Sequence, residues 1–226
     1  MRTFFLFYLL SSLLHNPLLA LLLVAVVAYF LNARLSGRYF NPARIYNRYS
    51  AVQELRRTLR LNDNDVGAHN DLGRILADQG KYEDALPHMV KAIERMGESA
   101  ETNYYLGLCR LMTGDCERGI SDIRRSLEIN PGFLYGQPFV TLARHYRAND
   151  INDEALEAAS QAVKINTSSV EGWLIAGEAH EASGDTAAAR ESYRAAGEAY
   201  EHLPRYLRLA NRGFARQARR ALRRLG

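Results

Sequence analysis

Cysteine, tryptophan and metal-binding motifs are scarce in this sequence. Its 226 residues include two Cys, one Trp and six His. Two Cys are too few for a disulfide-stapled fold, and Cys109 and Cys116 are not in a CxxC spacing. The sequence has no HxxxH or HExxH pair, Gly-rich phosphate loop or GxSxG elbow. We interpret the Cys and His residues as packing or surface residues, and we predict no enzyme activity, metal, cofactor or small-molecule substrate.

Charge is distributed unevenly along the chain. Residues 1–63 carry eight Arg and two acidic residues, and residues 64–204 carry 13 basic and 23 acidic residues. Residues 205–226 carry eight Arg and no acidic residue. The net charge of +4 for the whole chain is therefore the sum of two basic ends and an acidic middle. An acidic middle argues against a simple nucleic-acid-binding domain, but it leaves that role open for the basic tail.

A long apolar segment lies at the amino terminus. Residues 4–31 contain no Asp, Glu, Lys or Arg. As one helix they would be about 42 Å long, against roughly 30 Å of membrane hydrocarbon. Two structures fit: a tilted helix kinked at Pro17, or a short interfacial helix and a second helix separated by a break at residues 15–17. The segment is too long for the apolar core of a cleaved signal peptide, so residues 1–31 are predicted to be a membrane anchor.

The Arg residues beside this segment predict its orientation. Arg2 precedes it, whereas four Arg follow it within residues 32–48. The more basic flank of a span usually stays in the cytoplasm, so we expect a single-pass cell-membrane protein whose residues 32–226 are cytoplasmic. Residues 32–47 mix Arg with aromatic residues. This juxtamembrane connector either contacts lipid headgroups or is an ordinary linker.

A spacing of 34 residues recurs after residue 65. Leu72-Gly73 recurs as Leu106-Gly107 at this spacing, and Gly80 recurs as Gly114. Four units follow from it: 66–99, 100–133, 136–169 and 170–203, with two residues inserted between the second and the third. Small residues recur at positions 8, 20 and 27 of the units, and larger, mostly apolar residues at positions 4, 7 and 24. This pattern predicts pairs of closely packed antiparallel helices that stack on one another.

The repeat resembles the tetratricopeptide repeat over residues 66–203. The resemblance implies an all-α fold, a right-handed superhelix of helix-turn-helix units, here preceded by a transmembrane helix. The whole chain also resembles a group of bacterial membrane-anchored tetratricopeptide-repeat proteins, which share an aromatic-rich amino-terminal run, the motif here found as His15-Asn16-Pro17-Leu18-Leu19-Ala20-Leu21-Leu22, and an Arg-rich juxtamembrane stretch. This second resemblance implies an architecture and no activity.

Two further helices are expected at the ends of the array. Ala51, Leu55 and Leu59 match second-helix positions of the repeat, so residues 48–63 are predicted to form a lone second helix that caps the amino end. Residues 204–226 are predicted to form an Arg-rich amphipathic helix, because their apolar residues recur every three or four positions. Repeat arrays need such a terminal helix with a polar outer side.

The resemblance implies a concave groove lined by positions 2, 5, 9, 12 and 13 of each unit. Here the lining is basic in the third unit, apolar in the second and acidic in the fourth, which suits an extended peptide or a partner helix. The alternative is the solvated face of a spacer. The predicted groove residues are Asn70, Arg74, Asp78, Glu101, Tyr104, Leu108, Leu111, Gln137, Val140, Arg144, Arg147, Glu171, Leu174, Glu178 and Glu181.

The basic tail has three interpretations. It is a solvating cap, a contact for anionic lipid, or a binding site for an acidic protein or RNA. The residues concerned are Arg205, Arg208, Arg212, Arg216, Arg219, Arg220, Arg223 and Arg224.

The sequence thus predicts a membrane-anchored scaffold or adaptor that binds a protein partner in its groove. The alternatives are an extracytoplasmic envelope-assembly factor with the opposite orientation, and a membrane-tethered binder of anionic lipid or nucleic acid through the Arg-rich helix.

Overall fold

The computed structural model describes residue 8, residues 17–36 and residues 42–226. These residues form eleven α-helices, one 3-10 helix and no strand. The helices are α2 (Pro17–Ser36), α3 (Pro42–Leu61), α4 (Val66–Asp78), α5 (Tyr82–Met96), α6 (Ala100–Thr113), α7 (Cys116–Ile129), η1 (Phe133–Gly136), α8 (Gln137–Ala148), α9 (Asn152–Ile165), α10 (Val170–Ala182), α11 (Thr186–His202) and α12 (Arg205–Arg224). They fall into two units, Met1–Pro42 with Pro204–Ala210, and Ala43–Leu203 with Asn211–Gly226.

The first unit contains α2, whose sequence is rich in Leu and Val. Large apolar side chains along it are exposed, among them Leu18, Leu22 and Phe30. The sequence predicts a transmembrane helix within residues 4–31; in the part of the chain that the structure describes, no helix is both long and apolar enough to cross a membrane. The start of the predicted anchor, apart from Tyr8, and residues 37–41 of the predicted connector lie outside the described residues.

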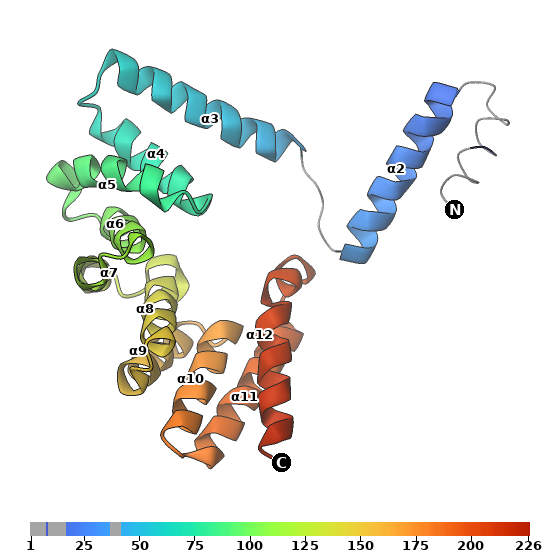
Figure 1. Cartoon of the computed structure of the whole chain (residues 1–226), viewed down its shortest axis with the longest axis vertical. Coiled ribbons are helices and arrows are strands. Elements are labelled where there is room, and N and C mark those ends of the chain that lie inside the picture. The colour runs from blue at the N-terminus through green and yellow to red at the C-terminus, as the bar shows by residue number, and fades with distance from the viewer. Residues whose placement is uncertain (1–7, 9–16, 37–41) are drawn as a thin grey trace. The chain divides into compact units, whose positions relative to one another are not determined.

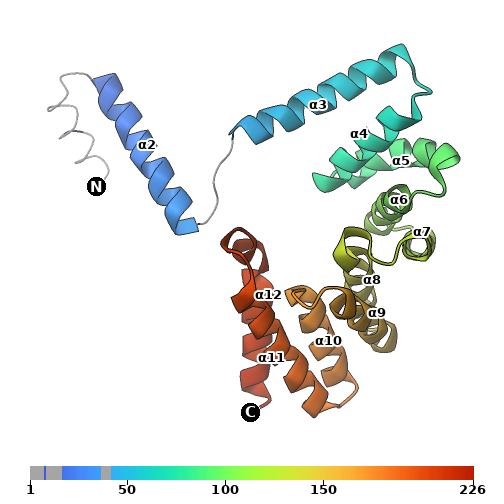
Figure 2. The ribbon, with the colours of Figure 1, turned by 180° about the vertical axis from the view of Figure 1, so that it is seen from behind.

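The second unit is a stack of four helix pairs, α4–α5, α6–α7, α8–α9 and α10–α11 (Figures 1 and 2). Each first helix packs along the second helix of its own pair, and α6 and α10 also pack along the second helix of the preceding pair. First helices also meet one another, α4 with α6 and α8 with α10. The predicted all-α repeat fold is therefore confirmed.

The turns inside the pairs need a left-handed backbone. Gly80, Gly114 and Gly184 have φ values of 76°, 97° and 82° there. Asp150 occupies the same position in the third pair with φ 57°. Glycine adopts this conformation without a steric cost, and Asp is among the residues that tolerate it best, so position 15 of the repeat sets where each first helix ends.

Small residues at position 8 let the two helices of a pair approach closely. A Cβ atom added at Gly107 would lie 2.7 Å from the carbonyl oxygen of Gly119 and 2.9 Å from the backbone nitrogen of Ile123. A Cβ atom at Gly177 would lie 2.6 Å from the ring of Tyr193. These distances explain why the repeat alternates small and large residues at fixed positions.

The helices at the two ends of the stack cover its apolar ends. Val52 and Leu59 of α3 belong to the core of the first pairs, and α3 begins at Pro42 rather than near residue 48 as expected. In α12, Ala215 and Ala218 are buried in the core that α10 and α11 build around Tyr193.

The insertion between the second and third pairs forms η1. Leu134 and Tyr135 both have a left-handed backbone, with φ values of 47° and 54°, and Gly136 follows with φ 78°. Two successive non-glycine residues in this region are uncommon. The chain is thereby redirected before α8 begins, and α7 and α8 meet over a much shorter stretch than α5 and α6 or α9 and α10 do.

Candidate functional site

The fifteen predicted groove residues all lie on the first helices of the pairs. The four helices α4, α6, α8 and α10 are together called the first-helix face below. On it, α4 carries Asn70, Arg74 and Asp78; α6 carries Glu101, Tyr104, Leu108 and Leu111; α8 carries Gln137, Val140, Arg144 and Arg147; α10 carries Glu171, Leu174, Glu178 and Glu181.

Polar contacts join α4 to α6. The hydroxyl group of Thr102 donates a hydrogen bond to Asn70 Oδ1 over 2.9 Å, and both side chains are buried. The hydroxyl group of Tyr105 donates to Asp78 Oδ1 over 3.1 Å. Burial and the neighbouring Asp78 carboxylate raise the pKa of Tyr105, so this phenol stays protonated and remains a donor. Asn70 is therefore part of the packing between repeats rather than a free groove residue.

Three other predicted groove residues are also buried. Tyr104, Val140 and Leu174 are 5%, 4% and 4% exposed. The Tyr104 hydroxyl lies 3.3 Å from Thr141 Oγ1 on α8, and its ring meets the Phe133 ring edge to face at 5.7 Å between centroids. Tyr104 thus links α6 to α8, and all three residues are too buried for a partner to contact much of their surface.

The charged residues of the third and fourth units pair with each other. Arg144 Nε and Nη2 donate to the two carboxylate oxygens of Glu171 over 2.7 and 2.9 Å. Arg147 Nε lies 3.3 Å from Glu178 Oε2. The hydrogen bond to Glu171 raises the pKa of Arg144, and burial raises the pKa of Glu178. The basic and acidic zones that the sequence suggested are thus one line of ion pairs along α8 and α10.

A similar contact occurs between the first two units. Arg74 Nε lies 3.5 Å from Glu101 Oε1. Arg74 and Arg144 both occupy position 9 of a unit, and Glu101 and Glu171 both occupy position 2 of the next one, so each pair is separated by 27 residues. This spacing is the sequence signal that would have identified both pairs in advance.

The acidic end of the first-helix face is closed by the carboxy-terminal helix. Arg224 Nη2 donates to both carboxylate oxygens of Glu181, over 2.6 and 2.8 Å. The Tyr193 hydroxyl donates to Glu181 Oε2 over 2.8 Å. The basic tail and the groove were predicted as separate sites, and no spacing in the sequence links residues so far apart. The structure joins them at Glu181.

The apolar part of the first-helix face is centred on α6. Met112 is 57% exposed, and Leu108 and Leu111 are half-buried. Arg144 on α8 keeps about half of its side chain exposed while it is paired. A partner on this face would therefore meet thioether and aliphatic surface beside neutralised ion pairs.

All eight Arg of the predicted basic tail lie on α12. Arg219 Nη2 pairs with Glu201 Oε1 over 3.2 Å. Arg212, Arg216, Arg220 and Arg223 are exposed and have no ion-pair partner within the described residues. Their spacing of four, four and three residues places them on one side of the helix, here called the arginine stripe.

Two histidines that the sequence suggested were isolated form a pair. His69 Nδ1 lies 2.8 Å from His88 Nδ1, and His69 Nε2 lies 2.9 Å from the carbonyl oxygen of Asp63. His69 is buried, and burial lowers the pKa of His88. Within the described residues no group of three or more His, Cys, Asp or Glu could hold a metal ion.

Cys109 is a packing residue of α6. It is fully buried, and burial raises the pKa of its thiol to about 12. A thiol with such a pKa is protonated at neutral pH and therefore a weak nucleophile.

The chain belongs to the tetratricopeptide repeat family. The family model described as "Tetratricopeptide repeat" matches residues 50–95, 70–132 and 140–204. The chain is 26% identical over 111 residues to the "TPR repeat-containing protein YpiA" of Bacillus subtilis (strain 168). The match covers 49% of this chain and 26% of YpiA, so this chain spans about a quarter of the length of YpiA. The resemblance to the tetratricopeptide repeat that the spacing predicted is thereby confirmed.

Solved structures show the same fold at low sequence identity. A crystal structure of MamA is 24% identical with a TM-score of 0.60, and the match covers 66% of this chain and 86% of MamA. The crystal structure of the yeast Tom70 is 14% identical with a TM-score of 0.58, and it covers 79% of this chain and 38% of Tom70. At these identities the likeness defines the architecture alone.

Proposed function

We propose that this chain is a non-enzymatic scaffold that binds a protein partner, as a peptide or a helix, on its first-helix face. The observation that carries this proposal is the surface around Met112. There an exposed thioether and half-buried Leu108 and Leu111 lie on a helix that polar contacts fix on both sides. An apolar centre with a polar rim is typical of a protein interface.

The ion pairs at this face set its specificity in our proposal. Arg144 and Arg147 are already paired with Glu171 and Glu178, so they present neutral, ordered hydrogen-bonding groups rather than free charge. Such pairs contribute more to the choice and register of a partner than to raw affinity. The partner therefore needs apolar side chains opposite α6 and complementary polar groups opposite α8.

Charge reversal tests this proposal. We expect Arg144→Glu/Arg147→Glu to abolish capture of the partner from membranes, because each Glu would face the acidic residue that now pairs with the Arg. The control variant is Lys164→Glu/Arg194→Glu, which places the same charge change on exposed residues of α9 and α11. Equal capture by both variants would contradict the proposal. Tyr104 is left unchanged, because its burial would confound folding with binding.

Membrane attachment of this scaffold is a second part of the proposal. It is supported by the uncharged run of residues 4–31 and by the exposed apolar side chains of α2. Four Arg follow this uncharged run, and the more basic flank of a span usually stays in the cytoplasm. We therefore propose that the chain is held at the cell membrane with the repeats on the cytoplasmic side. The opposite orientation would make it an extracytoplasmic envelope-assembly factor.

The arginine stripe favours a second candidate function, the binding of an anionic lipid surface or a nucleic acid. Its four Arg are exposed and unpaired within the described residues, and guanidinium groups bind phosphate well. Binding of the purified chain to vesicles with and without anionic lipid, and to RNA, at low and high salt would test this candidate. Loss of binding after Arg212→Gln/Arg216→Gln/Arg220→Gln/Arg223→Gln is expected; no effect of this variant would contradict it.

A further inference from the structure

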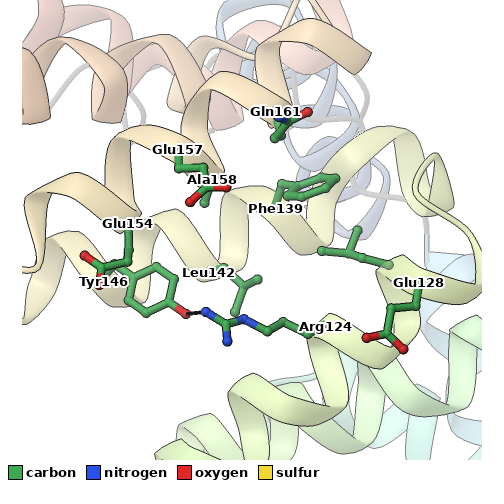
Figure 3. Close-up of a pocket in the computed structure, with 10 residues that line it drawn as sticks. Arg124, Glu128, Phe139, Leu142, Tyr146, Glu154, Glu157, Ala158 and Gln161 are labelled. Carbon is green, nitrogen blue, oxygen red and sulfur yellow. Dashed lines mark hydrogen bonds between the residues drawn. The ribbon is translucent and has the colours of Figure 1, made fainter.

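A pocket lies between the second and third helix pairs, and its lining residues differ from the predicted groove residues. It has a volume of about 370 Å³, and residues of α7, α8 and α9 line it (Figure 3). We call it the α7–α9 pocket. None of the predicted groove residues lines it, so it is independent of the proposed protein-binding face.

The pocket lies at the junction that contains the two-residue insertion before α8. Leu134 and Tyr135 redirect the chain through two successive left-handed residues, and α8 then contacts α7 over a short stretch only. At the neighbouring junctions, α5 lies along α6 and α9 lies along α10 over much longer stretches. The pocket therefore coincides with the junction where the repeat spacing is broken.

Part of the pocket wall is apolar. Leu127 of α7, Leu142 of α8 and Ala158 of α9 line it with aliphatic surface, and Phe139 adds an aromatic ring. Such a volume and lining would accept one large apolar side chain. Figure 3 shows Phe139, Leu142 and Ala158 around this space.

One cationic side chain, Arg124, also lines the pocket and is hydrogen-bonded to its wall. Arg124 Nη2 donates to the hydroxyl group of Tyr146 over 3.0 Å, as drawn in Figure 3. Tyr146 is buried in the wall. The Arg124 guanidinium is thereby anchored beside the cavity.

The rim on α9 carries negative charge without a partner. Glu154 and Glu157 lie one turn apart, are exposed, and have no ion-pair partner within the described residues. Glu128 on the α7 side is already engaged, because Arg125 Nη1 donates to it over 3.1 Å. Within the described residues, the charges at the pocket without an oppositely charged partner are thus the carboxylates of Glu154 and Glu157 and the Arg124 guanidinium, so negative charge is in excess beside the apolar wall.

We propose that the α7–α9 pocket is a second docking site, which binds a protein segment with one aromatic side chain flanked by Arg or Lys. The aromatic ring fills the space between Leu127, Leu142 and Ala158, and the flanking cations pair with Glu154 and Glu157. Aromatic anchors seated in a pocket with charged groups at the rim carry most of the binding energy in many interfaces. The scaffold would then hold two partners at once, one on each side of the repeat stack.

Peptide probes test this site in the full chain, kept in neutral detergent micelles. A fluorescein-labelled peptide with Trp between two Arg is titrated with the protein, and fluorescence anisotropy is recorded. Two matched peptides replace the Trp by Ala or both Arg by Glu. We expect saturable binding of the first peptide, about twentyfold weaker binding without the Trp because its apolar area is lost, and none with Glu beside the acidic rim.

Two variants locate the binding. Ala158→Leu should fill the cavity and abolish binding of the Trp peptide. Glu154→Gln/Glu157→Gln should weaken it about fivefold, since exposed ion pairs contribute modestly. The control variant Glu83→Gln/Glu94→Gln removes two exposed carboxylates from α5 and should change nothing.

Several outcomes would overturn the inference. One is no saturable binding, another is binding that Ala158→Leu leaves intact, and a third is equal binding of the Trp and Ala peptides. If Glu154→Gln/Glu157→Gln behaves as the control does, a basic partner is wrong. Arg144→Glu/Arg147→Glu should leave this binding unchanged, so failure of the pocket and failure of the first-helix face are distinguishable.

Discussion

The closest helix approach in the second pair gives a prediction for Gly107→Ala. The new Cβ atom would lie 2.7 Å from the Gly119 carbonyl oxygen and 2.9 Å from the Ile123 nitrogen, both of them backbone atoms that cannot move without shifting α7. Overpacking of this kind costs about 1–3 kcal/mol, and backbone contacts favour the upper end. Ala gains about 1 kcal/mol over Gly in a helix. We therefore expect a net loss of about 2 kcal/mol in the free energy of unfolding.

Gly197→Ala is the matched control for this prediction. Gly197 lies within α11, and a Cβ atom added there would meet nothing within 4 Å. Only the helix-propensity gain remains, so this variant should be stabilised by about 0.5–1 kcal/mol. Urea unfolding of the full chain followed by circular dichroism measures both values. If Gly107→Ala is as stable as the native chain or more stable, the reasoning about close approach at position 8 is refuted.

Further predictions concern pH, ion pairing and topology. Burial lowers the folded-state pKa of His88, so the free energy of unfolding should be highest above about pH 6.5 and decrease as the pH falls through that value. Urea unfolding from pH 8 to 5.5 should show this decrease, and the His88→Gln variant should show a smaller one. Arg144→Ala should cost about 1–3 kcal/mol in urea unfolding, because Arg144 is half-exposed but its loss leaves the Glu171 carboxylate, only 14% exposed, without its partner; no loss would mean that the pair does not stabilise the fold. A tag after Gly226 should be cleaved by protease in inverted membrane vesicles and protected in right-side-out vesicles; the reverse result would place the repeats outside the cytoplasm.

The repeat was predictable because it obeys a spacing. Small residues at position 8, such as Gly107 and Gly177, and turn residues such as Gly114 recur at fixed offsets, since each unit meets the same steric limits. Helix ends were less predictable. α3 begins at Pro42, and proline is well tolerated in the first turn of a helix, but nothing in the repeat pattern marks that position.

The sequence predicted which helices carry the groove residues, but not which of these residues are buried. Position numbers placed Tyr104 and Val140 on a first helix correctly, but burial at the junctions between units is decided by packing that periodicity does not describe. The same holds for Arg224, which reaches Glu181 from another helix. The α7–α9 pocket lies at the junction that contains Leu134 and Tyr135, where the sequence showed an insertion but not the left-handed backbone of these residues.

Site-specific photocrosslinking tests the central proposal most directly. A photoreactive amino acid is placed at Met112 on the first-helix face, or at Val90 on α5 as the control, in the full chain in intact membranes. Both positions are exposed, 57% and 39%. We expect one discrete protein adduct from position 112 that Arg144→Glu/Arg147→Glu removes, and no such adduct from position 90. The same adduct from both positions, or its persistence in the variant, would contradict partner binding on the first-helix face.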